Sequence, residues 1–205
     1  MTPRPHLHAT CIQRAVRRWL YLKWIVVDTE TASLRGAVIQ VAVVGLSESM
    51  APLLEYREYW SNVDASIDPR AEAVHGISAE DLLVKGRCPL VGIDRLRRLL
   101  RRRGVIFVAH NALFDLQRLA HTADALGVAP LDPPTVLCTM KASRGQCGLV
   151  TATGHAKAPK NEELYHFLFP DAPPPSGLHD ALVDARITAA SLAEGHRRGM
   201  WDAFI

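Results

Sequence analysis

The chain has 205 residues, of which 48% are hydrophobic and 22% charged, with a formal net charge of +3 and a pI near 8.8. This length favours one globular domain over several, and the mild basicity permits nucleic-acid binding without arguing for it. The four cysteines form no CxxC pair, which argues against a zinc site and favours free thiols in a reducing compartment. No apolar run reaches the roughly 18 to 20 residues of a membrane span, so we expect a cytoplasmic protein.

The first 27 residues carry five basic side chains and no acidic one. We expect residues 1–22 to form a solvated basic extension and residues 23–205 to form the folded domain. An organellar presequence is the alternative for the extension, although serine is absent there. His6, His8 and Cys11 suggest a metal clip, but a tail is the simpler interpretation of so short a cluster.

Three strands are predicted at the start of the domain, at residues 24–27, 37–46 and 53–60. The first two segments are apolar and rich in β-branched residues, and the third contains several aromatic residues. Together they predict an antiparallel meander. Ser78, followed closely by two acidic residues, then indicates the start of a helix.

The middle of the chain alternates between helix and strand. A helix opening at Pro89 is expected to end at Gly104, and residues 105–109 have the length and apolarity of a strand that is buried on both faces. Residues 111–126 follow as a second helix. Its predicted apolar side contains Leu113, Leu116, Leu119 and Ala120.

The last third contains a predicted fifth strand at residues 135–140, a loop at 145–160, and helices at 162–169 and 180–195. A Pro-rich link at residues 170–177 separates the two helices. Three strands followed by helices that alternate with two further strands predict an α/β fold. We expect a mixed five-stranded central sheet flanked by helices.

Two carboxylates, Asp28 and Glu30, stand at the end of the first predicted strand, where alternation directs both to the same side. Alone, such a pair is most often a solvated strand end. The strand at 105–109 leads to Asn111 and Asp115, which are four residues apart and should share a helix face. Because ligands collect at the carboxyl ends of strands in α/β sheets, Asp115 is expected near the first pair.

His179 and Asp184 add the last part of the predicted site. A separation of five residues turns a helix by roughly 140° away from alignment, so these two would not share a face if both were helical. His179 is therefore expected in the loop or at the helix start, with Asp184 held on the helix. Asp180 is expected to cap the helix rather than bind a metal.

Four carboxylates and a histidine make chemical sense together mainly if divalent cations neutralise the acids. Carboxylate oxygens suit Mg²⁺ or Mn²⁺, which also bind phosphates. Two such ions about 4 Å apart can activate a water and stabilise the leaving oxygen in phosphodiester hydrolysis. An imidazole nearby can accept the proton of that water.

Three segments resemble, in order, the three motifs of the DnaQ-like DEDDh 3′→5′ exonuclease family: VVDTET at 26–31, VAHNALFD at 108–115 and HDALVD at 179–184. AVHGI at 73–77 resembles a further family segment, and residues 159–169 resemble phage and bacterial stand-alone members. The resemblance covers most of the chain. It implies an RNase H-like fold.

The resemblance also implies removal of nucleoside 5′-monophosphates from single-stranded or frayed 3′ ends with two divalent cations, Mg²⁺ or Mn²⁺. Carried over, Asp28, Glu30 and Asp184 would hold the ion that activates the nucleophile. Asp28 would bridge to a second ion, which Asp115 supports. His179 would be the general base. Its spacing of five residues to Asp184 distinguishes this family from the sister branch, which has a tyrosine in the third motif.

By the same analogy, six residues would line the pocket for the terminal nucleotide: Thr31, Leu34, Val74, His75, Asn111 and Phe114. The chain departs from the family pattern at three places. Ala32-Ser33-Leu34 stands where Gly-Leu is usual, Gln40 where glutamate is frequent, and Cys138 where aspartate is often found. These departures concern substrate preference more than activity.

The strongest charge run contains six arginines between residues 95 and 103. It could grip phosphates, but a polar helix face opposite the leucines is an equal alternative. Lys157 and Lys160, near the loop before His179, are further candidates for contacts with a nucleic-acid backbone.

The leading hypothesis is an exonuclease that acts on DNA ends in proofreading or repair, with a DNA polymerase as a candidate partner. An RNA-trimming exoribonuclease of the same superfamily is the enzymatic alternative, and the sequence does not separate the two. A non-catalytic, polymerase-associated binding module is the alternative from another class, but it would be expected to lack a metal ligand. The oligomeric state stays open.

Overall fold

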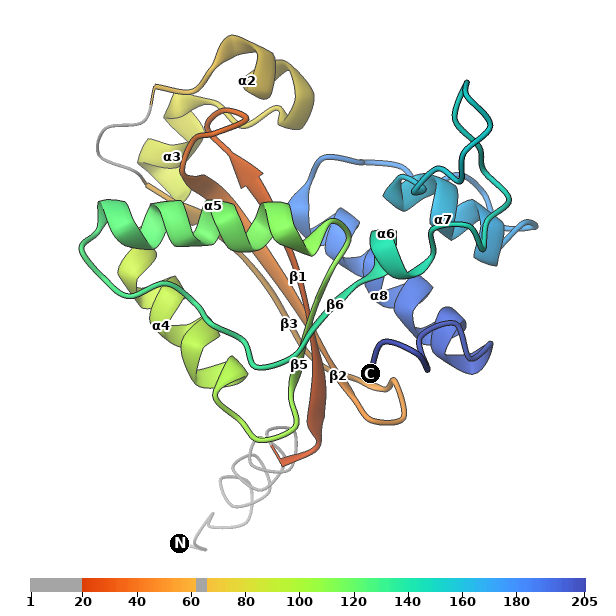
Figure 1. Ribbon diagram of the computed structural model, residues 1–205. Helices are drawn as coiled ribbons and strands as arrows, with labels where there is room; N and C mark the ends of the chain where they lie inside the picture. Colours follow the sequence, from red (N-terminus) through yellow and green to blue (C-terminus); the bar gives the residue numbers. More distant parts are fainter. Residues whose placement is uncertain (1–19, 62–65) are drawn as a thin grey trace, which may run out of the picture.

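The computed structural model describes residues 20–61 and 66–205, which form a mixed sheet between layers of helices (Figure 1). The sheet has six strands in the order β4-β3-β2-β1-β5-β6. The strands are β1 (Leu22–Thr31), β2 (Val38–Ser47), β3 (Pro52–Trp60), β4 (Gly86–Arg87), β5 (Ile106–Ala109) and β6 (Val136–Cys138). The helices are α2 (Pro69–His75), α3 (Ala79–Lys85), α4 (Pro89–Leu100), α5 (Ala112–Ala125), α6 (Thr139–Ala142), α7 (Asn161–Leu168) and α8 (Ala181–Arg197).

The central strands β1 and β2 set the geometry of the sheet. β2 pairs antiparallel with both β1 and β3, and all ten of its residues are buried. A strand covered on both faces needs apolar side chains on both, which explains its run of valine, isoleucine and alanine. β5 runs parallel to β1, and β6 runs parallel to β5. The carboxyl ends of these three strands therefore meet at one edge of the sheet.

Alternating side chains of β1 enter two separate cores. Ile25 and Val27 pack in a core with residues of α4 and α5, whereas Trp24 and Val26 pack in a core with residues of α7 and α8. A register slip of one residue would exchange the two sets, so burial on both faces fixes the strand firmly. The same alternation directs the acidic residues at the end of β1 toward the side that α8 covers.

The predicted mixed α/β sheet is confirmed, but it has six strands rather than five. The additional strand, β4, has only two residues and pairs in parallel with the end of β3, so it is too short to leave a sequence pattern. Helix α2 was not predicted; it begins with Pro69 after Asp68, whose side chain accepts a hydrogen bond from the backbone N–H of Arg70. The predicted fifth strand also ends early, because residues 139–142 form α6.

The predicted apolar side of α5 was wrong at Leu113, which is 52% exposed. The buried stripe instead contains Ala112, Asp115, Leu119 and Ala123, which recur at helical spacing. One member of this stripe is a carboxylate. A pattern based on apolar residues alone therefore found Leu116 and Leu119, which pack in the core, but wrongly included Leu113 and left out Asp115.

Most of the predicted extension, residues 1–22, lies outside the described residues, as does the suggested clip of His6, His8 and Cys11. Within the described part of the chain the three cysteines are free thiols, as predicted. No helix in that part is long and apolar enough to cross a membrane.

Gly92 on α4 allows the close approach of Trp60, the last residue of β3, whose side chain is fully buried. A Cβ at Gly92 would lie 2.5 Å from Cζ2 of Trp60. Alanine normally stabilises a helix by about 1 kcal/mol relative to glycine, whereas overpacking a core costs about 1–3 kcal/mol. We expect Gly92→Ala to lower the urea midpoint of unfolding. Gln117→Ala, on the exposed face of α5, is the control, and a raised midpoint for Gly92→Ala would contradict this packing.

Candidate active site

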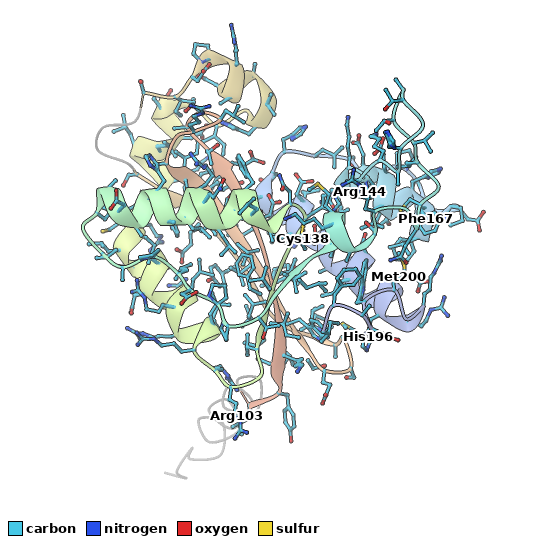
Figure 2. All side chains as sticks on the ribbon, in the orientation of Figure 1. Arg103, Cys138, Arg144, Phe167, His196 and Met200 are labelled. Atoms are coloured by element: carbon cyan, nitrogen blue, oxygen red, sulfur yellow. The ribbon has the colours of Figure 1, made fainter. Side chains whose placement is uncertain are left out.

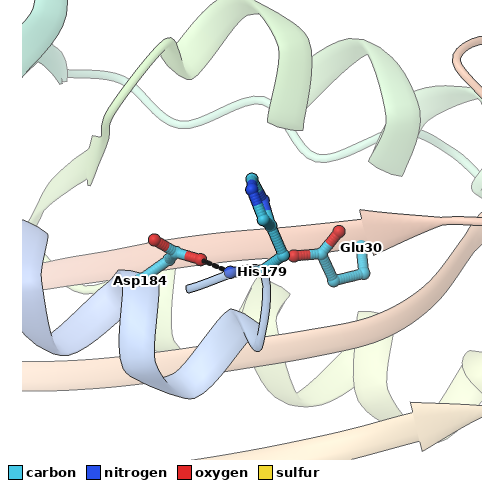
Figure 3. Close-up of side chains that lie close together, drawn as sticks. All are labelled: Glu30, His179 and Asp184. Atoms are coloured by element: carbon cyan, nitrogen blue, oxygen red, sulfur yellow. Dashed lines mark hydrogen bonds between the residues drawn. The ribbon is translucent and has the colours of Figure 1, made fainter. Parts of the chain in front are cut away.

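The predicted acidic residues come together at the edge where β1 and β5 end. Figure 3 shows Glu30 of β1 beside Asp184 of α8 and His179, which precedes that helix. One carboxylate oxygen of each acid and one ring nitrogen of His179 lie within 4.8 Å of one another. Such a group has the residue types and spacing that can hold a metal ion.

Asp28 and Asp115 extend this group into the protein. The pKa of Asp28 lies well above its ordinary value, mainly because the carboxyl is buried, and then because Asp115, Asp184 and Glu30 are close and of like charge. Asp115 is 3% exposed and lies in the first turn of α5. The structure therefore brings all four predicted carboxylates into one electrostatic cluster.

The other three carboxyls share this perturbation. Burial, followed by Asp184 and Asp115, raises the pKa of Glu30 to about 8. Burial raises the pKa of Asp115 to about 7 despite a hydrogen bond from Thr29, and burial also raises the pKa of Asp184. Without cations, Glu30 and Asp115 are therefore at least partly protonated near neutral pH. Hard oxygen donors that repel one another in this way fit a divalent cation such as Mg²⁺ or Mn²⁺.

Short hydrogen bonds orient two of the acids. The hydroxyl of Thr29, on the opposite face of β1 from Asp28, donates to Oδ1 of Asp115 over 2.9 Å. The backbone N–H of His179 donates to Oδ2 of Asp184 over 2.7 Å (Figure 3). Both donors stabilise the charged form of the acid, and both leave a second carboxylate oxygen for a ligand.

His179 lies outside α8, as expected, and has a left-handed backbone with φ of 65°. The helix begins after Asp180, whose Oδ1 accepts hydrogen bonds from the backbone N–H groups of Leu182 and Val183. Asp180 also forms an ion pair with Arg57 of β3. Its predicted role as a helix cap is confirmed.

Two neutral side chains that the sequence did not single out as supports hold α8 in place, one from the sheet and one from α7. Gln40 lies opposite Glu30 in the β1–β2 pair, is 1% exposed, and accepts a hydrogen bond from the backbone N–H of Ala181. Asn161 of α7 donates to the backbone carbonyl of Asp184 and accepts from the hydroxyl of Thr188. The only prior signal was that Gln40 replaces the frequent glutamate.

His110 connects the end of β5 to the loop before α7. One ring nitrogen, Nδ1, lies 3.0 Å from the hydroxyl of Thr139, and the other, Nε2, lies 3.0 Å from the carbonyl oxygen of Pro159. A carbonyl only accepts, so Nε2 carries the hydrogen, and burial lowers the pKa of the ring to about 4. Neutral His110 thus fixes the segment that leads to Asn161.

The six predicted pocket residues come from the end of β1 and the loop after it, from α2, and from the start of α5. Thr31 is buried at the end of β1, whereas Leu34 and Val74 are 78% and 55% exposed. His75 ends α2, and its pKa is lowered mainly by burial, with the carbonyl of Thr31 and the ring of His179 close enough to influence it. The remaining two, Asn111 and Phe114, lie at the start of α5 and are partly buried.

Asn111 does not share a helix face with Asp115, contrary to expectation. It precedes α5 in a left-handed conformation, with φ of 74° and ψ of 47°. It lines a cavity of about 400 Å³ between the ends of β5 and α7, together with Met140, Lys160, His179 and Asp184. Asn111 therefore faces the site from the turn before the helix.

Lys157 and Lys160, which were predicted to contact a nucleic-acid backbone, both form ion pairs within the chain. Lys157 Nζ donates to both carboxylate oxygens of Glu163, over 2.7 and 3.0 Å. Lys160 Nζ lies 3.6 Å from Glu162. These pairs reduce the net positive charge that either lysine offers to a phosphate.

Residues 25–192 match the exonuclease family model RNase_T. A curated relative, exodeoxyribonuclease 10 of Escherichia coli strain K12, is 28% identical over 180 residues, which cover 87% of this chain and 70% of the relative.

Solved structures share the fold. Exonuclease X in complex with 5′ overhanging duplex DNA matches with a TM-score of 0.60 at 27% identity, covering 86% of this chain and 93% of that one. E. coli exonuclease I in a zinc-bound complex with single-stranded DNA matches with a TM-score of 0.72 at 17% identity, covering 88% of this chain. The match spans only 42% of the exonuclease I chain.

The raised carboxyl pKa values predict how stability depends on pH. A carboxyl with a higher pKa in the folded than in the unfolded protein stabilises the fold at low pH, and this contribution is lost as pH rises through the folded pKa. With EDTA present, we expect the Tm to fall from about pH 5 to about pH 8, the interval between the ordinary pKa of a glutamate and the pKa of about 8 that Glu30 has in the folded protein, and to level off above it. Mg²⁺ should raise the Tm more at the upper end.

Glu30→Gln is the control for this titration, because it removes one ionising group while keeping its size. The fall in Tm with pH should become shallower in this variant. A Tm in EDTA that stays constant over the same pH range in the unsubstituted protein would contradict the proposed electrostatic cluster.

Proposed function

This chain belongs to the RNase_T exonuclease family, and from that premise we propose that it removes nucleoside 5′-monophosphates from the 3′ ends of DNA. The observation that carries the proposal is the convergence of four carboxylates with raised pKa values beside one exposed histidine. Perturbed groups of this kind are typical of functional sites. A purely structural cluster of acids would be expected to pair with lysine or arginine instead.

We assign the four acids, Asp28, Glu30, Asp115 and Asp184, to two divalent cations, Mg²⁺ or Mn²⁺. When bound, such ions neutralise the phosphate and lower the pKa of water. The negative charges of the other three acids all raise the pKa of Asp28, so Asp28 is close to each of them. This supports its assignment as the ligand that both ions share. Thr29 and the backbone of His179 hold two of the carboxylates in orientation.

We assign the role of general base to His179. Its ring nitrogen lies within 4.8 Å of carboxylate oxygens of Glu30 and Asp184, so it can accept a proton from a water held between them. The residue is exposed, so the ring can pass the proton to solvent. Its backbone is tied to Asp184, which keeps the base beside the reacting centre.

The terminal nucleotide is assigned to the side of the cluster that Thr31, Leu34, Val74, His75, Asn111 and Phe114 surround. Exposed Leu34 and Val74 offer apolar contacts for a base. DNA is proposed rather than RNA because the similar proteins include an exodeoxyribonuclease and an exonuclease bound to DNA. We further propose that the ends arise in repair or proofreading, where a DNA polymerase would be the partner that extends the trimmed strand.

The activity is tested with 5′-labelled DNA and RNA oligonucleotides in Mg²⁺, Mn²⁺ or EDTA. We expect the DNA to shorten from its 3′ end with either metal and to stay intact in EDTA. Asp184→Asn should reduce the rate at least about 100-fold, because it weakens a metal ligand. Faster shortening of RNA would overturn the choice of DNA as substrate. If neither strand is shortened, the proposed exonuclease activity is overturned.

Asp180→Asn is the matched control, four residues before Asp184. Asparagine caps a helix as well as aspartate does, and the exposed pair with Arg57 is worth at most about 1 kcal/mol. We expect this variant to keep its rate within about fivefold.

His179→Ala should lower the rate constant by about 10² to 10⁴ if the ring is the general base. Metal binding, measured by calorimetry with Mn²⁺, should change far less than in Asp184→Asn. A parallel loss of metal affinity would instead make His179 a ligand, and an unchanged rate would remove it from the mechanism.

A further inference from the structure

The arginine run at the end of α4 divides into two sets. Arg95 forms an ion pair with Glu58 of β3, and Arg98 forms one with Asp94 on the same helix. These two belong to the ordinary polar face of the helix. The other four arginines lie toward the loop between α4 and β5, where Figure 2 labels Arg103.

Two cavities adjoin each other at this loop, and Arg103 and Gly104 line both of them. The first, of about 730 Å³, is also lined by Tyr21 and Lys23 at the start of β1. The second, of about 480 Å³, is also lined by Arg97, Arg101 and Arg102. We call this surface the distal basic surface, because it surrounds the amino-terminal ends of β1 and β5, opposite the candidate active site.

Positive charge dominates the distal basic surface. Five lysines and arginines line its two cavities, against two acids, Glu48 and Asp132. The Arg97 guanidinium donates to the carbonyl oxygen of Ala129, a neutral acceptor that leaves its charge uncancelled. Within residues 20–61 and 66–205, no carboxylate forms an ion pair with Arg101 or Arg103.

The surface also offers apolar contacts beside the charges. Leu20 and Tyr21, which line the first cavity, are 68% and 65% exposed, whereas the apolar residues that line the second cavity, Leu100, Val105 and Leu131, are buried. Proteins that bind single-stranded nucleic acid without sequence preference combine basic side chains, which contact the phosphates, with apolar and aromatic side chains, which contact the bases. An acidic protein partner would use the charges but not require the exposed aromatic ring.

We propose that the distal basic surface binds the single-stranded part of the substrate that lies 5′ of the end being trimmed. This inference rests on the proposed function, which puts the 3′ end at the acidic cluster. Lys23 and Glu30 are seven residues apart on β1, so the two sites are separated by about 23 Å. With its bases stacked, at about 3.4 Å per phosphate, a strand needs about seven nucleotides to span this straight-line distance, and a path around the protein surface is longer.

The distance makes the effect dependent on substrate length. A tetranucleotide can occupy the active site but cannot reach the distal basic surface, whereas an oligonucleotide of about 30 nucleotides can occupy both. We expect the double variant Arg101→Gln/Arg103→Gln to raise KM about tenfold or more for the long strand. The kcat for the long strand and all constants for the tetranucleotide should stay unchanged.

Binding without turnover gives an independent measurement. With EDTA present, the affinity of the wild-type protein for the labelled long strand is measured at several salt concentrations. Each lost phosphate contact reduces the slope of log K against log salt by about 0.7 for a single strand, so the double variant should lose about 1.4. Arg87→Glu, exposed on β4 away from both cavities, removes the same net charge and should leave the slope unchanged.

The outcomes separate the two proposals. If the wild-type protein shortens neither strand, the proposed function fails. If it shortens both, and the double variant has the same KM and salt slope as the wild type, the distal contact with nucleic acid is overturned. An equal loss in Arg87→Glu would also overturn it, because general charge would then explain the effect.

Discussion

Four carboxylates repel one another at one edge of the sheet, and the rest of the structure must keep them together despite this repulsion. Burial of Asp28 and Asp115 strengthens this repulsion, because a low dielectric constant screens it poorly. Among the described residues, no lysine or arginine forms an ion pair with any of the four. The negative charge of the cluster is therefore not neutralised by basic side chains of the described residues, and protons or external cations must neutralise it.

The supports around the cluster are polar but neutral at working pH. Gln40 holds the first turn of α8, Asn161 holds the carbonyl of Asp184, and His110 holds the segment that leads to Asn161. A charged support would either add to the repulsion or cancel the charge that attracts cations. Gln40 illustrates this, since a glutamate at that position would place a fifth carboxylate directly opposite Glu30. Neutral hydrogen bonds thus fix the positions of the acidic side chains without changing the net charge of the cluster.

Sequence reasoning reached the sheet, its main strands and helices, and the residues that converge at its edge, because apolar periodicity and strand-end acids leave strong local signals. It placed His179 before α8 correctly from the five-residue spacing. It missed β4, which is too short for a pattern, and it placed the exposed Leu113 on the buried side of α5, where Asp115 lies instead. The supporting bonds of Gln40 and Asn161 depend on contacts between distant segments, which no local pattern records.

The order of the site residues along the chain has a consequence for synthesis. Asp28 and Glu30 lie on β1, the first strand of the sheet, whereas Asp184 lies on α8, the last helix described. Contacts between such distant segments close large loops and form late in folding. A ribosome releasing this chain therefore exposes the β1 acids well before their partners exist. The acidic cluster is completed only when α8 docks, so a chain that has not yet folded its last helix lacks one of the four carboxylates.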